Sequence, residues 1–108
     1  MRPELRDCAI REIGCIVCSE RGLGFVPCEK HHLLTTGRHG TGKRRGETYT
    51  VGLCPYHHRG IGAPDAALGP SYAREPRRFR ELYPDEWLLD RQNELIEAWR
   101  KNTMGAAA

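Results

Sequence analysis

The sequence predicts a small α+β domain with a strand, loop, strand, helix core and flanking helices. Three observations favour this fold class. Two pairs of metal-binding residue types lie at positions 15–18 and 54–57, a glycine-rich stretch separates two segments that have strand character, and the C-terminal third is helical in pattern. The expected core covers about residues 14–62, and the helical extension covers about 71–102.

Composition limits how the chain can be stabilised. Its 108 residues fit one domain, 1–108, but aromatic residues make up only 7% and there are 12 glycines and 7 prolines, so little bulky material is available for a core. A domain of this kind usually needs a metal or disulfides. The odd number of cysteines, together with the lack of a signal peptide or membrane-spanning run, favours a reducing, cytoplasmic setting and metal ligation.

Patterning places the individual elements. The segment Glu47 to Leu53 has β-branched and aromatic residues, Pro55 is suited to open a short helix that Gly60 ends, and an apolar stripe of about 3.6-residue period runs from Leu88 to Trp99. In chain order, we expect a helix at 3–12, a Cys-x-x-Cys turn at 15–18, strands at 28–34 and 47–53 around a loop at 35–46, and helices at 55–58, within 71–82 and at 84–102.

Two short motifs supply a full set of zinc ligands. Cys15-Ile-Val-Cys18 and Cys54-Pro-Tyr-His57 each have two residues between the ligands, which lets the backbone turn tightly enough for both side chains to reach one ion. Three thiolates and one imidazole form a complete tetrahedral shell. We therefore predict that Cys15, Cys18, Cys54 and His57 bind a structural zinc ion. The alternative is that they are ordinary buried cysteines.

The remaining cysteines are Cys8 and Cys28, and we interpret both as small apolar fillers of the core. An alternative stays open for Cys28, which lies close in sequence to a histidine pair. If it took a zinc position, His57 would be the ligand to lose its place.

Adjacent histidines occur twice, as His31-His32 and His57-His58. Neighbours in a strand point to opposite faces, so His31 and His32 are expected to have different roles, one as a metal ligand and the other as a general base. On the short helix, His57 can face the zinc while His58 faces elsewhere. The alternative is a treble-clef-like zinc module with surface histidines and no catalytic chemistry.

Basic residues in the glycine-rich loop lie between the two expected strands. Such side chains can contact phosphates without reading bases, although a solvated charge run is the usual interpretation. The net charge of +3 does not by itself identify a nucleic-acid-binding protein. The predicted nucleic-acid-binding residues are Arg38, Lys43, Arg44 and Arg45. The arginines at 59, 74, 77, 78 and 80 can extend the footprint, although some of those at 74–80 are expected to form only the solvated face of a helix.

The segments CEKHHLL (28–34) and ETYTVGLCPYHHRG (47–60) resemble the HNH endonuclease superfamily, whose core is called ββα-metal, and more closely its phage-associated branch similar to Ref-type, RecA-dependent nucleases. The resemblance implies a zinc-stapled hairpin and helix that grip a catalytic divalent ion. By this resemblance, His31 is a metal ligand, His32 the general base and His58 a ligand from the helix. The family asparagine would fall near Thr48 or Tyr49, and no third protein ligand is evident.

The implied activity is metal-dependent hydrolysis of DNA phosphodiesters, with a role in phage recombination. An ion held by two imidazoles is compatible with Mg, Mn or Zn, and Arg59 is expected to steady the charged transition state. The implied partners are DNA and a RecA-type recombinase filament, in the cytoplasm of the host cell if the chain is phage-encoded. The alternatives are a non-catalytic zinc-bound nucleic-acid-binding module and a protein-interaction zinc domain whose C-terminal helix docks a partner.

Overall fold

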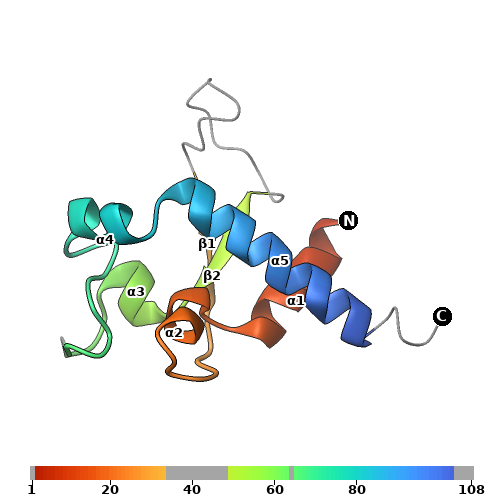
Figure 1. Cartoon of the computed structure of the whole chain (residues 1–108), viewed down its shortest axis with the longest axis horizontal. Coiled ribbons are helices and arrows are strands. Elements are labelled where there is room, and N and C mark those ends of the chain that lie inside the picture. Colours follow the sequence, from red (N-terminus) through yellow and green to blue (C-terminus); the bar gives the residue numbers. More distant parts are fainter. Residues whose placement is uncertain (1, 34–48, 64, 104–108) are drawn as a thin grey trace.

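The structure is a computed structural model that describes residues 2–33, 49–63 and 65–103. Within these residues it is an α+β protein with a two-stranded antiparallel sheet, as the sequence predicts (Figure 1). The expected loop at 35–46, with its four predicted phosphate-contacting residues, lies outside the described residues. The elements are α1 (Pro3–Ile13), α2 (Ile16–Glu20), β1 (Glu29–His32), β2 (Thr50–Leu53), α3 (Pro55–Arg59), α4 (Pro76–Leu82) and α5 (Asp85–Thr103).

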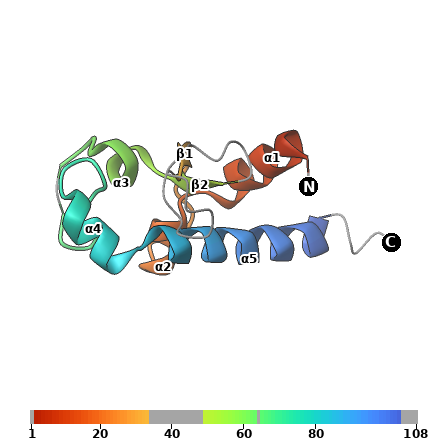
Figure 2. The ribbon, with the colours of Figure 1, turned by 90° about the horizontal axis from the view of Figure 1, so that it is seen from above.

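The hairpin occupies the middle of the molecule (Figures 1 and 2). Helix α5 crosses the hairpin and contacts β2, while α1 contacts both α5 and β2 at the end of the molecule where α1 begins and α5 ends. Helices α3 and α4 lie at the opposite end. One buried cluster includes Cys15 of the predicted core as well as Phe79 and Leu88 of the predicted extension. The boundaries of the single domain stay a prediction.

One expected turn is a helix in the structure. The Cys15 thiol accepts a hydrogen bond from the backbone N–H of Cys18 at 3.4 Å and so caps the N-terminus of the five-residue α2. The Cys54 thiol caps α3 in the same way, with His57 N at 3.4 Å. Helix α3 then ends at Gly60, which takes the left-handed conformation with φ 72°. Both predicted ligand pairs therefore lie at helix N-termini.

The register of the hairpin decides which side chains share a face. Glu29 lies opposite Leu53 and His31 opposite Val51, whereas Lys30 and His32 alternate with them. Glu29 contacts α3, and the ammonium group of Lys30 lies 3.2 Å from a carboxylate oxygen of Asp7 in α1. One face of β1 is thus turned toward α3 and the other toward α1.

Buried polar contacts lock the hairpin to the long helices. Arg6, which is 7% exposed, donates from Nη2 to the carbonyl oxygen of Thr50 at 2.6 Å and from Nη1 to Oδ1 of Asn93 at 2.8 Å. The fully buried Gln92 accepts a hydrogen bond from the backbone N–H of Gly52 at 2.7 Å. These bonds fix α1, β2 and α5 to one another in a protein with a small apolar core.

No helix among the described residues combines the length and apolar character that a membrane crossing requires.

Candidate metal centre and histidine cluster

The four predicted zinc ligands come together, although they lie in two motifs far apart in sequence. The ligand atoms of Cys15, Cys18, Cys54 and His57 all lie within 4.8 Å of one another. The sulfurs of Cys18 and Cys54 are 3.8 Å apart, and His57 Nδ1 lies 3.6, 3.5 and 3.2 Å from the sulfurs of Cys15, Cys18 and Cys54. Zn–S and Zn–N bonds of about 2.3 and 2.1 Å in a tetrahedron separate two sulfurs by about 3.8 Å and sulfur from nitrogen by about 3.6 Å. The cluster can therefore hold zinc.

The chemistry of the donor set also fits a cation. All four side chains are buried, and Cys18 and His57 are 0% exposed. Burial raises the pKa of the Cys18 thiol to about 11, and hydrogen bonding to Cys54 together with burial raises the pKa of Cys15. Three buried thiolates without a compensating charge would be very unfavourable. A bound Zn²⁺ supplies that charge.

The segment after α3 orients the imidazole of this cluster. His57 Nε2 lies 2.6 Å from the carbonyl oxygen of Leu68, so Nε2–H donates and Nδ1 is left to face the sulfurs. Tyr72 N donates to the carbonyl oxygen of His57 at 2.8 Å, and the Tyr56 hydroxyl donates to the carbonyl oxygen of Gly69 at 2.7 Å. The candidate zinc centre therefore ties the segment around 68–72 to α3.

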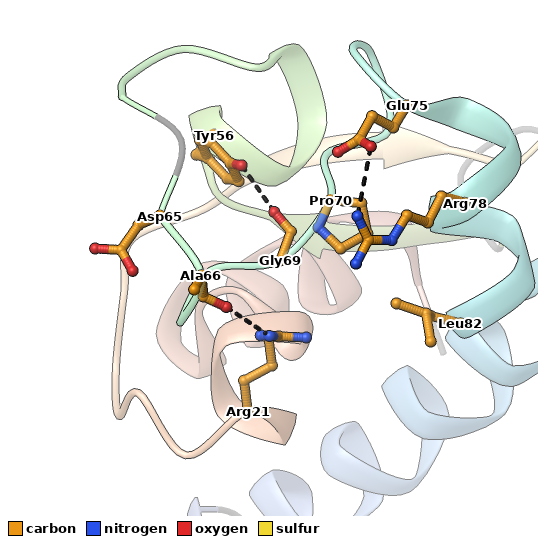
Figure 3. A pocket seen from close by; sticks show the side chains of 9 residues that line it. All are labelled: Arg21, Tyr56, Asp65, Ala66, Gly69, Pro70, Glu75, Arg78 and Leu82. Atoms are coloured by element: carbon orange, nitrogen blue, oxygen red, sulfur yellow. Dashed lines mark hydrogen bonds and ion pairs between the residues drawn. The ribbon is translucent and has the colours of Figure 1, made fainter.

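The same segment borders a hollow of about 440 Å³. Figure 3 shows Arg21, the residue that follows α2, reaching the carbonyl oxygen of Ala66, with Arg78 and Leu82 of α4 on the other side. None of the predicted metal or catalytic residues lines the hollow. Its lining residues are Arg21, Tyr56, Asp65, Ala66, Gly69, Pro70, Glu75, Arg78 and Leu82.

A second group of chemically active side chains forms where β1 meets α3. The imidazole rings of His31 and His58 have their centroids 4.9 Å apart and are nearly perpendicular, at 69°. The ring of Tyr72 lies 4.9 Å from that of His31. The structure thus brings together the two histidines that the resemblance assigns to a catalytic ion.

Glu29 belongs to this group, although the sequence analysis did not select it. Its Oε1 lies 2.8 Å from His58 Nδ1, and Arg59 holds both carboxylate oxygens, with Nε and Nη2 each at 2.7 Å. The hydrogen bonds from Arg59, and then those from His58, hold the pKa of Glu29 below its usual range. The ionised carboxylate accepts a hydrogen bond from Nδ1–H, which leaves Nε2 of His58 as a lone-pair donor. The two-residue spacing from His31 on a strand was the signal that could have revealed Glu29.

His31 is 8% exposed. Burial, with smaller contributions from the nearby charges of His58, His32 and Arg80, lowers the pKa of its imidazole to about 4. The ring is therefore neutral at physiological pH and can donate a lone pair to a metal. Within residues 2–33, 49–63 and 65–103, however, the Cys₃His cluster is the one group of three or more ligand atoms close enough to hold an ion. A catalytic ion at His31 and His58 stays a prediction.

The other predicted residues take separate positions. His32 is half-buried at the end of β1, on the face that carries Lys30. Cys28 is half-buried outside the Cys₃His cluster, and its thiol contacts the carbonyl oxygen of Ile10 at 3.3 Å. The thiol of Cys8 contacts Glu12 Oε2 at 3.4 Å on the surface of α1.

The fold and the site define a small α+β protein with a Cys₃His centre of zinc type beside a histidine pair. A family model described as "Recombination enhancement, RecA-dependent nuclease" matches residues 4–97. The chain belongs to this family, whose description names nuclease activity and a role in recombination. Comparison with curated proteins and with solved structures gave no match.

Proposed function

We propose that the protein is a metal-dependent DNA endonuclease of the HNH type that hydrolyses phosphodiester bonds in phage recombination. The observation that carries the proposal is the pairing of His31 and His58, with Glu29 fixing the tautomer of His58, directly beside the Cys₃His cluster. The family match over residues 4–97 supports the nuclease reaction and a recombinase-coated DNA substrate.

The Cys₃His cluster gives this site its rigidity. His57 belongs to the same five-residue helix as His58, Cys54 caps the N-terminus of that helix, and the cluster joins both to Cys15 and Cys18 at α2. A structural zinc bound there would fix His58 relative to β1 without a large apolar core. The site is thus built on a short helix that the cluster anchors to α2.

The histidine pair fits a divalent ion as two imidazole ligands with open positions for water and phosphate oxygens. The contact of His58 Nδ1 with the Glu29 carboxylate supports this role, because metal-ligating histidines commonly donate one ring nitrogen to a carboxylate and keep the other for the ion. A Mg or Mn ion, or a second Zn, would neutralise charge on the phosphate and on the departing oxygen. We propose His31 and His58 as its protein ligands.

We propose His32 as the general base that takes a proton from the attacking water. It is the last residue of β1 and neighbours the proposed ligand His31, but by strand alternation it points to the other face. For His32 to serve as base, the phosphate has to lie across the end of β1. The loop that carries Arg38, Lys43, Arg44 and Arg45 follows this end in the sequence, which suits it to bind the flanking phosphates.

Arg59 is the other proposed catalytic residue. Its guanidinium is engaged by Glu29 through two hydrogen bonds, and its side chain is 55% exposed. A role on the transition state stays a prediction. In the present arrangement Arg59 braces the carboxylate that orients His58.

Replacing His32 with alanine is expected to lower the rate of DNA cleavage by about 10²- to 10⁴-fold, because the attacking water loses its proton acceptor. Zinc content, thermal unfolding and DNA affinity should stay near those of the parent protein. Supercoiled and single-stranded DNA, incubated with Mg or Mn with and without a recombinase filament, provide the assay. Lys30→Ala, a change on the same face of β1, is the matched control and should cleave normally.

Two results would contradict parts of this proposal. Loss of zinc from His32→Ala would show that His32 contributes to zinc binding and that the assignment of the histidines to the structural and catalytic metals is wrong. DNA binding without cleavage by the parent protein under every condition would instead identify a zinc-bound nucleic-acid-binding module.

A further inference from the structure

Arg80 of α4 is linked to the histidine pair through Tyr72, although it is far from both β1 and α3 in sequence. Its Nη2 donates to the Tyr72 hydroxyl at 2.8 Å, and its Cζ lies 5.3 Å from the centroid of the Tyr72 ring. The same Tyr72 ring also neighbours His31, at 4.9 Å between ring centroids. A continuous set of contacts therefore leads from an exposed guanidinium to the imidazole of a proposed metal ligand.

The ring between them is held firmly. The backbone N–H of Tyr72 donates to the carbonyl oxygen of His57 at 2.8 Å, and its ring packs edge-on against Phe79 at 5.8 Å. Phe79 is 0% exposed and precedes Arg80 in α4. Both ends of the contact between Tyr72 and Arg80 are thus anchored, one to the candidate zinc centre and one to the core.

The surroundings of Arg80 leave its charge uncompensated. Arg59 is paired with Glu29, and Arg78 lies 3.6 Å from Glu75, whereas Arg80 has no carboxylate partner among the residues that the structure describes. A guanidinium has five N–H donors, and its observed hydrogen bond is to a neutral phenol. The remaining donors and the full positive charge are available to an anion.

We propose that Arg80, positioned by Tyr72, binds a non-bridging oxygen of the phosphodiester that is cleaved at the His31 and His58 site. This inference rests on the proposed nuclease function. A guanidinium is suited to the role because its planar donors match phosphate oxygens and it stays charged at any physiological pH. Among the residues that the structure describes, Arg77 and Arg78 of the same helix have no contact with the histidine pair or with Tyr72.

A contact with the cleaved phosphate can be told from a contact with flanking phosphates by the size of the substrate, because a small diester has no flanking phosphates. We compare Arg80→Ala and Arg80→Lys with the matched control Arg77→Ala, using both DNA and thymidine 5′-(p-nitrophenyl) phosphate, a diester too small to reach a flanking contact. Loss of a donor to the reacting phosphate is expected to lower kcat by about 10²- to 10³-fold for Arg80→Ala on both substrates. Arg80→Lys should recover part of that loss. Arg77→Ala should leave hydrolysis of the small diester unchanged.

Anion binding by Arg80 can also be followed without cleavage. In zinc-loaded protein with ¹⁵N-labelled arginine, titration with dimethyl phosphate and Mg should shift the Nε–H resonance of Arg80 in a saturable way and leave that of Arg77 in place. Zinc content and circular dichroism of each variant show whether the fold is retained.

Equal activities of Arg80→Ala and Arg77→Ala on the small diester, in a parent protein that hydrolyses it, would overturn the assignment of Arg80. If the parent protein hydrolyses neither substrate, the proposed function fails, and the titration alone decides the anion site. A saturable shift would then retain Arg80 as a phosphate-binding residue, and an unchanged resonance would remove it.

Discussion

Replacement of Cys18 with alanine is expected to unfold the protein. The Cys18 sulfur is fully buried, 3.8 Å from the sulfur of Cys54 and 3.5 Å from His57 Nδ1, and no other cysteine is placed to substitute for it within the described residues. Zinc binding to such sites contributes about 10–16 kcal/mol at neutral pH. Small domains have a net stability of about 5–15 kcal/mol, so loss of a ligand can remove all of it.

Far-UV circular dichroism and zinc content of the purified variant test this expectation. Cys28→Ala is the matched control, because Cys28 is half-buried but lies outside the Cys₃His cluster, and this variant should keep its zinc and its fold. Removal of zinc from the parent protein with a chelator should reproduce the unfolding, and added zinc should reverse it. A folded, metal-free Cys18→Ala protein would contradict a structural role for the cluster.

Replacement of His58 with alanine is expected to abolish cleavage while the zinc-loaded fold persists. His58 is half-buried at the surface of α3 and contributes no ligand to the Cys₃His cluster, whereas it is one of two proposed protein ligands of the catalytic ion. Changes to residues that only support a metal ligand lower metal affinity or activity by about 10- to 100-fold. Loss of the ligand itself should therefore lower cleavage by at least about 100-fold. Mn²⁺ binding, measured by electron paramagnetic resonance, should weaken in parallel.

The variant Glu29→Gln tests how much the orientation of His58 contributes to metal binding, while His58 itself is kept as a ligand. The variant keeps the side-chain shape but loses the charge that binds Arg59 and polarises His58, so a loss of about 10- to 100-fold in Mn²⁺ affinity is expected. Glu75→Gln is its control, since that carboxylate pairs with Arg78 on the exposed surface of α4. Unchanged Mn²⁺ binding in both His58→Ala and Glu29→Gln would show that the ion, if one is bound, is held elsewhere.

The parts of the fold that the sequence predicted are those with strong local signals. Pro55 and Gly60 bound α3, and the apolar stripe ending at Trp99 predicted a helix that the structure has as Asp85–Thr103. The spacing of the two ligand pairs predicted a cluster that the structure brings within 4.8 Å. In each case, local backbone geometry or the coordination chemistry of the residue types decides the outcome.

The parts that were missed depend on contacts between distant segments. The short helix α2 replaces the expected turn at 15–18. The Cys₃His cluster fixes the Cys15 thiol, and that thiol caps the N-terminus of the helix. Glu29 was detectable from its two-residue spacing to His31, but its hydrogen bonds to His58 and Arg59 depend on how β1 and α3 pack. The contact between Tyr72 and His31 had no sequence signal. The segment after α3 has no helical or strand periodicity, and its position depends on hydrogen bonds to His57 of the Cys₃His cluster.

The most direct test of the account is cleavage of DNA by the zinc-loaded protein in the presence of Mg, with the DNA either bare or coated by a recombinase filament. We expect cleavage of the coated DNA that requires added Mg or Mn and that is lost in His58→Ala. DNA cleavage that proceeds equally well with His58→Ala, or retained DNA binding with no cleavage on either substrate, would contradict a nuclease centre at the histidine pair.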